Sequence, residues 1–348
     1  MIIGQGLAGS LLAYELLQRG GSVDVVNKTD RHCSSYVAAG LYNPITGRKM
    51  IKTWNADKVF PTLEHYYRDL ELHLGAGFLY PSQIYRPFMA MEEQNEWQGR
   101  IADGNYNSMI EELTTGQGSN PDIHDQYGGL RLKNAGYVDV GALLDACRQY
   151  FVERDSYYEA VFQEEDMQIR NEAAIWKDRK YGHVVYCQGQ AVRNNPHFNW
   201  LPLRPVKGEI LDVDIAYNER FILNRGVFLL PSSAHRPSRL GSTYDNHRLD
   251  HQPTEKAIEY LREKLGMIFA HDFRIVKHIA GIRPATKDRK PLIGTHPAIK
   301  ELSIFNGFGT KGVSLAVYYA KQFANHLQGN GLIDDEVNIQ RFMSLYPN

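Results

Sequence analysis

The sequence predicts an α/β fold of two domains, one of which is a Rossmann-like dinucleotide-binding domain. Three observations support this prediction. A glycine fingerprint near the first residue lies between a short apolar segment and a helical pattern, and a second glycine-rich turn near the other end of the chain also precedes a helical pattern. The chain has 348 residues, of which 43% are hydrophobic, and this length is more typical of two domains than of one.

The first glycine-rich turn has the spacing G-x-G-x-x-G, with its glycines at Gly4, Gly6 and Gly9. In this pattern the first glycine permits a tight turn, the second lets the backbone approach a pyrophosphate, and the third lets the helix pack close to the strand. Leu7 and Ala8 begin the predicted helix, whose exposed N–H groups and dipole favour an anionic ligand. We therefore predict that a dinucleotide pyrophosphate binds at this helix start.

A helix and a second strand complete this unit. Apolar residues recur on one helical face over residues 7–17, and residues 23–26 have the pattern of a strand. An acidic residue normally ends this second strand and binds the ribose hydroxyls, but here the position is Asn27, followed by Lys28. We therefore expect a lower affinity for the adenosine end of the ligand.

The first strand is also short. Only residues 1–3 precede the glycines, which suggests that the numbered start lacks a few native residues.

Residues 34–49 are rich in small side chains and are interrupted by an Asn-Pro pair and by glycines. This composition predicts a loop that passes close to something flat or bulky. Ala39, Gly40 and Leu41 lie in the middle of this loop, and Arg48 lies near its end. We expect the first three to contact the dinucleotide.

Hydrophobic periodicity and turn residues predict the remaining elements. Asp139 is the expected cap of a helix, and a buried strand pattern begins at residue 184 and ends at Gly189. Further helical patterns lie at residues 59–70, 255–265 and 313–327, further strand patterns at 78–80, 84–89, 210–213 and 227–230, and a polar, turn-rich loop at 114–122.

Composition argues against several classes of function. The formal net charge of -1 provides no general attraction to nucleic acid or to anionic membranes. The chain has no apolar run long enough for a transmembrane helix and no charged-then-apolar leader, so we expect a cytoplasmic protein. The 3 cysteines have no C-x-x-C pairing and the 13 histidines have no H-x-x-x-H spacing, so neither a disulfide framework nor a metal site is predicted.

Two further segments carry more specific motifs. Residues 281–294 read G-I-R-P-A-T-K-D-R-K-P-L-I-G, and residues 307–312 read G-F-G-T-K-G at the start of the last helical pattern. Together with the opening fingerprint and the strand at 184–189, and in this order, they resemble the FAD-dependent D-amino-acid oxidase superfamily, which includes glycine and sarcosine oxidases. Residues 205–211 and 309–312 also resemble, more loosely, the flavin domain of the enzyme that trims a carboxymethylamino group on the tRNA wobble uridine.

The resemblance implies a discontinuous fold. The FAD-binding domain would comprise residues 1–75, 136–200 and 275–348. An inserted α+β substrate domain with a mostly antiparallel sheet would comprise residues 76–135 and 201–274 and would shield the flavin face. The oligomeric state does not follow from either pattern.

The resemblance also implies FAD as the cofactor. Relatives with covalent flavin carry a cysteine near the G-x-R-P segment, and residues 281–294 contain none, so noncovalent FAD is expected, with His32 and Cys33 as the alternative attachment points. The implied FAD contacts are Gly4, Gly6, Leu7, Ala8, Gly9, Asn27, Lys28, Ala39, Gly40, Leu41, Gly189, Gly281, Arg283, Gly307, Phe308, Gly309, Thr310, Lys311 and Gly312.

Four residues are candidates for the reaction itself. Arg283 is the expected substrate ligand, because a guanidinium matches a carboxylate bidentately and its family position faces the flavin; the alternative is an ion pair with Asp288. Lys311 could supply a cation to the reduced flavin or be a solvated lysine at a loop tip. Arg48 could assist substrate or oxygen chemistry, or lie in an exposed turn. Tyr244 is a candidate for a pocket wall, with core packing as the alternative.

These inferences predict an FAD-dependent enzyme that oxidises the C–N bond of a small amino acid or N-substituted glycine by hydride transfer to flavin, with oxygen or another electron acceptor. Three alternatives stay open. A flavoprotein acting on a modified tRNA base would need a local basic patch, and nucleic acid is not an expected partner. A nicotinamide-dependent Rossmann enzyme would leave the last glycine turn unexplained. A non-catalytic FAD-fold binding protein is consistent with Asn27 and the short first strand.

Overall fold

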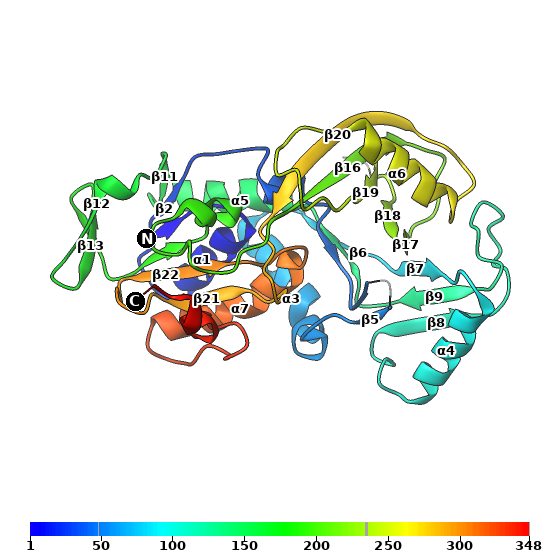
Figure 1. The fold of residues 1–348 in the computed structure, drawn as a ribbon, viewed down its shortest axis with the longest axis horizontal. Coiled ribbons are helices and arrows are strands. Elements are labelled where there is room, and N and C mark those ends of the chain that lie inside the picture. The colour runs from blue at the N-terminus through cyan, green and yellow to red at the C-terminus, as the bar shows by residue number, and fades with distance from the viewer. Residues whose placement is uncertain (48, 234–235, 348) are drawn as a thin grey trace.

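The computed structural model describes residues 1–47, 49–233 and 236–347 and contains two large β-sheets in different halves of the molecule (Figure 1). A six-stranded, mostly parallel sheet lies in the half that contains both chain ends, and an eight-stranded, largely antiparallel sheet lies in the other half. The mixed α/β fold with a Rossmann-like sheet is confirmed. The sheets alone do not define where one domain ends, so the domain limits stay a prediction.

The six-stranded sheet has the order β11-β2-β1-β15-β22-β21, and its strands come from opposite ends and the middle of the chain. All neighbours are parallel except β21 and β22. Because β1 lies between β2 and β15, the first glycine turn follows a central strand. The strands are β1 (Ile2–Ile3), β2 (Val25–Asn27), β11 (Tyr157–Glu159), β15 (Val184–Tyr186), β21 (Leu292–Thr295) and β22 (Leu302–Asn306).

Three long helices pack together with this sheet: α1 (Leu7–Gln18), α5 (Val140–Val152) and α7 (Gly312–Leu327). Each presents an apolar face to the larger hydrophobic core, which includes Leu11, Leu144 and Phe323. Helices α1 and α7 pack directly against each other, although they come from opposite ends of the chain (Figure 1).

The eight-stranded sheet has the order β20-β16-β19-β18-β17-β7-β9-β8, and every neighbouring pair is antiparallel except β17 with β7. One face contributes to the larger core, and the other face packs with α6 (Glu255–Gly266) into a second core. The strands are β7 (Ile84–Pro87), β8 (Ile110–Thr114), β9 (Gly129–Leu132), β16 (Val206–Asp214), β17 (Ile222–Arg225), β18 (Val227–Leu230), β19 (Ser238–Gly241) and β20 (Arg274–Arg283).

Smaller elements connect and cover these sheets. A sheet of order β3-β10-β6, one of order β12-β13-β14 and the β4-β5 pair complete the strands, with helices α2, α3 and α4 between them. Their bounds are α2 (Ser34–Val37), β3 (Leu41–Tyr42), β4 (Ile45–Thr46), β5 (Ile51–Lys52), α3 (Ala56–Leu74), β6 (Leu79–Pro81), α4 (Met91–Ala102), β10 (Gly136–Val138), β12 (Met167–Arg170), β13 (Ala173–Trp176) and β14 (Arg179–Tyr181), with 3-10 turns η1 (Glu164–Asp166), η2 (Gly189–Asn194) and η3 (Ile339–Leu345).

Most elements agree with the sequence patterns. The Asp139 carboxylate accepts the N–H of Ala142 and caps α5 as predicted, and β18 has the predicted bounds. The predicted loop at 34–49 contains the short helix α2 and strands β3 and β4, so that prediction was too simple. None of the helices in the described ranges has the length and apolar composition needed to span a bilayer.

Gly9 tests how the glycine fingerprint determines this packing. A Cβ atom at Gly9 would lie 1.9 Å from the Gly4 carbonyl oxygen and 3.2 Å from the Cys187 Cβ, so α1 could not keep its distance from β1. We predict that Gly9→Ala lowers the free energy of unfolding of the apoprotein by about 1 to 3 kcal/mol, measured by urea denaturation. A Cβ atom at Gly182 would meet no described atom within 4 Å, so Gly182→Ala is the control. Equal stability of the two variants would contradict the assigned packing.

Candidate functional site

The two glycine-rich turns meet in space because α1 and α7 begin side by side. A Cβ atom at Gly312, the first residue of α7, would lie 3.2 Å from Leu7 Cδ2, in the first residue of α1. Among the described α-helices longer than four residues, only α1 and α7 have neither a side-chain cap nor an acidic residue in the first turn. Backbone N–H groups at such uncapped starts suit phosphate or another anion.

Gly4 and Gly9 of the first turn lie where a side chain would collide with backbone, and Gly6 lies against the Ser35 side chain. Gly4 has a φ of +99°, and a Cβ there would lie 2.7 Å from the Cys187 carbonyl oxygen. Gly6 is the N-cap of α1 and faces Ser35, whose Oγ accepts the Leu7 N–H at 3.1 Å. Helix α2, which contains Ser35, therefore covers the start of α1, beside the half-buried Ala8.

Asn27 ends β2 next to this turn, as predicted. Its Oδ1 accepts the backbone N–H of Gln5 at 3.0 Å, and its Nδ2 donates to the Tyr157 hydroxyl at 3.3 Å. The amide thus connects the first turn to β11, while the following Lys28 is exposed. An oxygen at this position lies beside the helix start, where ribose hydroxyls are held in dinucleotide-binding folds.

The second turn follows β22 and lies against the end of β15. Asn306 Nδ2 donates to the Gly189 carbonyl at 2.9 Å, and Asn306 Oδ1 accepts the Gly307 N–H at 2.8 Å. Phe308 is buried, whereas Thr310 is exposed. Gly309 has a φ of +55°, which favours glycine. Lys311 is the N-cap of α7, and burial together with the nearby Arg289 charge lowers the pKa of its ammonium group.

The segment after α2 also approaches its neighbours closely. A Cβ at Gly40 would lie 1.8 Å from the Val138 carbonyl oxygen, so a larger residue would separate this segment from β10. Ala39 is buried and Leu41 begins β3. Gly281 of β20 packs against Val37 of α2, where its Cβ would lie 3.0 Å from the Val37 Cβ. Arg48 lies outside the described residues.

Arg283 ends β20, and its guanidinium lies flat on the backbone of β16. A Cβ at Gly208 would lie 2.0 to 2.2 Å from Nη2, Cζ and Nη1 of Arg283. Only glycine at position 208 therefore leaves room for this side chain. Successive residues of a strand point to opposite faces, so Arg283 lies on the face shared by Gly208 and Ile210, and Ile210 belongs to the larger core.

Neutral oxygens surround the guanidinium of Arg283. Its Nη1 donates to the Thr243 carbonyl at 3.1 Å and to the Lys207 carbonyl at 3.4 Å, and its Nη2 donates to Ser242 Oγ at 2.8 Å. The Tyr244 ring lies 4.7 Å from Cζ and is exposed on its other side, with 65% of the residue accessible. The Tyr244 ring therefore covers the Arg283 guanidinium and is not part of the hydrophobic core.

The alternative partner of Arg283 is engaged elsewhere. Asp288 Oδ2 accepts from Arg341 Nε at 2.9 Å, and within the described ranges no carboxylate pairs with Arg283. Burial lowers the pKa of the Arg283 guanidinium. The charge of this guanidinium has no carboxylate partner among the described residues, so it is available to an external anion.

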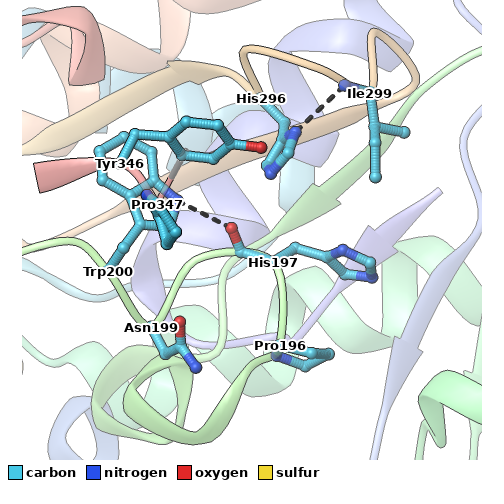
Figure 2. A pocket seen from close by; sticks show the side chains of 8 residues that line it. All are labelled: Pro196, His197, Asn199, Trp200, His296, Ile299, Tyr346 and Pro347. Atoms are coloured by element: carbon cyan, nitrogen blue, oxygen red, sulfur yellow. Dashed lines mark hydrogen bonds between the residues drawn. The ribbon is translucent and has the colours of Figure 1, made fainter. Parts of the chain in front are cut away.

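A separate hollow of about 230 Å³ lies near the carboxyl end of the chain, lined by Trp200, His296 and Tyr346 among others (Figure 2). Two of its polar groups are already bonded, since His296 Nδ1 accepts the Ile299 N–H and Trp200 Nε1 donates to the carbonyl of His197. None of the described site residues lines it. The described residues also contain no cluster of three or more metal-ligating side chains.

Comparison with known proteins identifies the family. The family model of DAO, FAD-dependent oxidoreductases, matches residues 1–326. The chain belongs to this family. FAD is therefore its cofactor, and the nicotinamide alternative is set aside. The paired uncapped helix starts and the glycine cradles fit such a dinucleotide.

One curated relative, the glycine oxidase of Pseudomonas aeruginosa, is 30% identical over 139 residues, which span 39% of this chain and 38% of that protein. The alignment thus covers less than half the length of either protein.

Solved structures share the fold over nearly the whole chain. The glycine oxidase from Bacillus cereus has a TM-score of 0.78 at 21% identity, covering 95% of each chain. The iminodiacetate oxidase from Chelativorans sp. BNC1 has a TM-score of 0.79 at 18% identity, covering 98% of this chain and 97% of that one. The L-proline dehydrogenase from P. horikoshii has a TM-score of 0.74 at 16% identity, covering 95% and 93%.

Sequence reasoning did not single out the groups that hold Arg283. Gly208 appeared only within a family-like segment, and Ser242 and Thr243 carried no signal. A glycine inside an otherwise apolar strand pattern was the one available indication, because it often marks close approach of another group.

Asn27 allows a direct test of the proposed ribose contact. We predict that Asn27→Asp tightens FAD binding about five-fold, because a charged acceptor is stronger by about 1 kcal/mol and aspartate, which has the same length as asparagine, retains the Gln5 contact. Titration of apoprotein with FAD gives the dissociation constant. Asn330→Asp adds the same charge at an exposed site and serves as the control. Weaker FAD binding by Asn27→Asp would contradict the assignment of Asn27 to the ribose site.

Proposed function

We propose that this FAD-dependent oxidoreductase acts on amino acids or amines, and that its substrate is a small amino acid or an N-substituted glycine whose C–N bond it oxidises. The observation that carries the proposal is Arg283, whose guanidinium has neutral oxygens as its hydrogen-bond partners in the described part of the chain. The glycine and iminodiacetate oxidases with this fold are named for substrates that combine an amine nitrogen with a carboxylate. That combination supports the same substrate class here.

The number of free donors on Arg283 fits a carboxylate. A guanidinium has five N–H donors, and the three bonds to Ser242, Thr243 and Lys207 leave two for a ligand. Two parallel donors match the two oxygens of a carboxylate. Binding such an anion would also offset the burial that lowers the pKa of Arg283.

The chain's own groups would bind and orient the reactants. The uncapped starts of α1 and α7 would hold FAD, with Leu7 and Gly312 as neighbouring first residues. FAD, when bound, accepts the hydride that leaves the substrate α-carbon. Loss of that hydride and the amine proton leaves an imine, which water hydrolyses. Arg283 would orient the carboxylate, and the eight-stranded sheet would exclude solvent.

Lys311 and the start of α7 would stabilise negative charge on the cofactor through a half-buried ammonium group and exposed N–H groups.

We propose noncovalent attachment of FAD. Cys33 supports this, because burial raises the pKa of its thiol and disfavours the nucleophilic thiolate. His32 is exposed on the loop between β2 and α2.

Truncation of Arg283 tests the substrate assignment. Arg283→Ala should lower kcat/KM for glycine, sarcosine and D-amino acids roughly 30- to 1000-fold, because a partly buried carboxylate loses its cation. Arg283→Lys should recover only part of this loss, since an ammonium group cannot form the bidentate contact. Steady-state kinetics are measured with oxygen and with an artificial electron acceptor.

Carboxylate-free amines and FAD affinity are the controls for this prediction. The dissociation constant of FAD should change little in Arg283→Ala, and oxidation of methylamine or dimethylamine should be slow in the wild type. If the wild type oxidises these amines as well as the acids, Arg283 is not a carboxylate anchor and the amino-acid assignment falls.

A further inference from the structure

The connection between β19 and α6 carries the groups that surround Arg283. Residues 242–254 form neither helix nor strand apart from one isolated bridge at Asp245. Ser242, Thr243 and Tyr244 begin this connection and contact the guanidinium. An irregular segment of this length needs anchors to hold side chains in one geometry.

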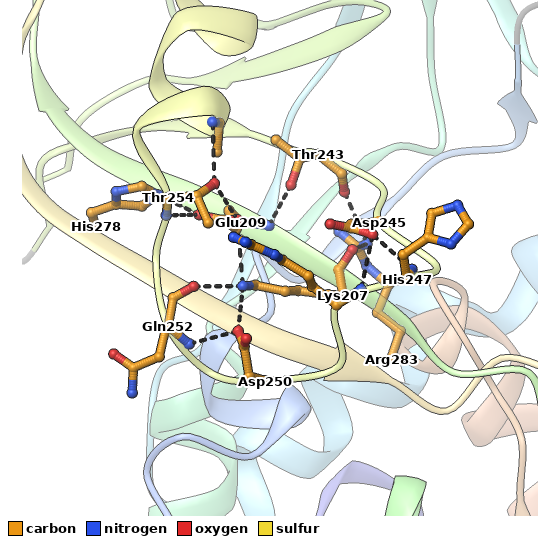
Figure 3. Close-up of polar contacts among 12 residues, drawn as sticks. Lys207, Glu209, Thr243, Asp245, His247, Asp250, Gln252, Thr254, His278 and Arg283 are labelled. Atoms are coloured by element: carbon orange, nitrogen blue, oxygen red, sulfur yellow. Dashed lines mark hydrogen bonds and ion pairs between the residues drawn. The ribbon is translucent and has the colours of Figure 1, made fainter.

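One buried ammonium group anchors the far end of this connection. Lys207 is only 1% exposed, and its Nζ donates to Asp250 Oδ1 at 2.6 Å and to the Gln252 carbonyl (Figure 3). Asp250 Oδ1 in turn accepts the Gln252 N–H at 3.1 Å. Hydrogen bonding to Lys207 lowers the pKa of the Asp250 carboxyl, so Asp250 is ionised near neutral pH. The single side chain of Lys207 thus holds two points of the connection.

Glu209 completes the anchor on the same face of β16. Its carboxylate accepts the N–H and the hydroxyl of Thr254 at 2.7 and 2.9 Å and lies 2.9 Å from His278 Nε2 and 3.7 Å from Lys207 Nζ. Burial alone would raise the pKa of Glu209, but these contacts hold it below its ordinary value. The end of the connection is therefore fixed where Thr254 caps α6.

The backbone of the same strand holds the near end of the connection. The N–H and carbonyl of Lys207 pair with the carbonyl and N–H of Asp245 at 2.9 and 3.0 Å, and the Glu209 N–H donates to Thr243 Oγ1 at 2.9 Å. The Lys207 carbonyl also accepts from Arg283. Lys207 therefore contacts the guanidinium through its backbone on one side of β16 and the anchored connection through its side chain on the other.

We propose that Lys207 is a positioning residue for substrate binding: its buried ammonium group holds residues 242–254 so that Ser242, Thr243 and Tyr244 keep Arg283 oriented toward the substrate carboxylate. This inference rests on the proposed function, in which Arg283 binds that carboxylate. A buried ion pair contributes little to stability compared with well-packed apolar residues, because desolvation of the charges offsets their attraction. Positioning of an irregular segment accounts better for a charged group at this point.

Lys207→Met tests the proposal, because methionine has a similar volume and no charge. In the FAD-loaded variant, the KM for sarcosine or glycine should rise roughly 10- to 100-fold with a much smaller change in kcat, since the variant loses carboxylate binding and retains hydride transfer. FAD affinity and the rate with carboxylate-free amines should stay at wild-type values. In the apoprotein, hydrogen exchange of the amides at residues 243–254 should be faster than in the wild type.

Asp250→Asn provides a second, milder variant, because the Asp250 side chain is half exposed and the buried Lys207 ammonium group keeps Glu209 at 3.7 Å and the Gln252 carbonyl. It should raise the same KM by a smaller factor. The double variant Lys207→Met/Asp250→Asn should be no worse than Lys207→Met alone, because both changes remove one contact. Should Lys207→Met fail to fold, Asp250→Asn still decides the question: an unchanged KM and unchanged exchange at 243–254 would overturn the proposal.

Arg225→Met is the matched control. Arg225 is a partly buried cation of the same sheet and is paired with Glu93. It lies in β17, which three strands separate from β20. Its loss should lower thermal stability and leave the KM for the acids unchanged. An equal rise of KM in Arg225→Met and Lys207→Met would show a general stability effect and overturn the positioning role. If Arg283→Ala keeps wild-type kinetics on the acids, the proposed function itself is contradicted. If Arg283→Ala loses activity on the acids and Lys207→Met keeps wild-type kinetics, only the positioning role of Lys207 is contradicted.

Discussion

The rest of the structure depends on the meeting of two uncapped helix starts. Leu7 and Gly312 are separated by nearly the whole chain. They nevertheless come together beyond the carboxyl ends of the neighbouring central strands β1, β15 and β22. Neither helix has a capping side chain at its N-cap residue or an acidic residue in its first turn, and Ser35 accepts only the Leu7 N–H of α1. In the proposed function the FAD pyrophosphate would bind the other N–H groups at these helix starts, so FAD binding should stabilise the packing of the chain's two ends.

The second sheet ends beside the second glycine turn, because Pro284, the residue after Arg283, accepts the Gly309 N–H at 3.2 Å. Its edge strand β20 ends at Arg283, and β16 offers a glycine on which the guanidinium lies. The surrounding oxygens are neutral, which leaves the charge to be matched by a ligand. In the proposed function the cofactor would supply the chemistry of hydride removal, and this pair of strands would select an acid as the substrate.

Local patterns predicted what local interactions determine. The periodicity of α1 and α7, the Asp139 cap and the G-x-G-x-x-G turn each depend on residues a few positions apart, and each is present as expected. The cradle of Arg283 depends on strand pairing, because its partners lie 40 to 76 positions away. Strand β20 escaped prediction since its mixed edge-strand exposure gives no clear alternation. Lys207 lies in the segment 205–211 that carried the looser resemblance, but its burial was not predicted, because burial of a charge follows from tertiary packing.

The most direct test of this account is a crystal structure of the FAD-loaded protein with glycolate, a carboxylate that lacks the oxidisable amine. The account predicts the pyrophosphate at the backbone N–H groups of Gly6 and Ala8, beside the Leu7 N–H that Ser35 accepts, and the glycolate carboxylate on the two free donors of Arg283. Ser242 and Thr243 should keep their present contacts. A pyrophosphate away from the start of α1, or a glycolate bound elsewhere while Arg283 contacts only its own chain, would contradict it.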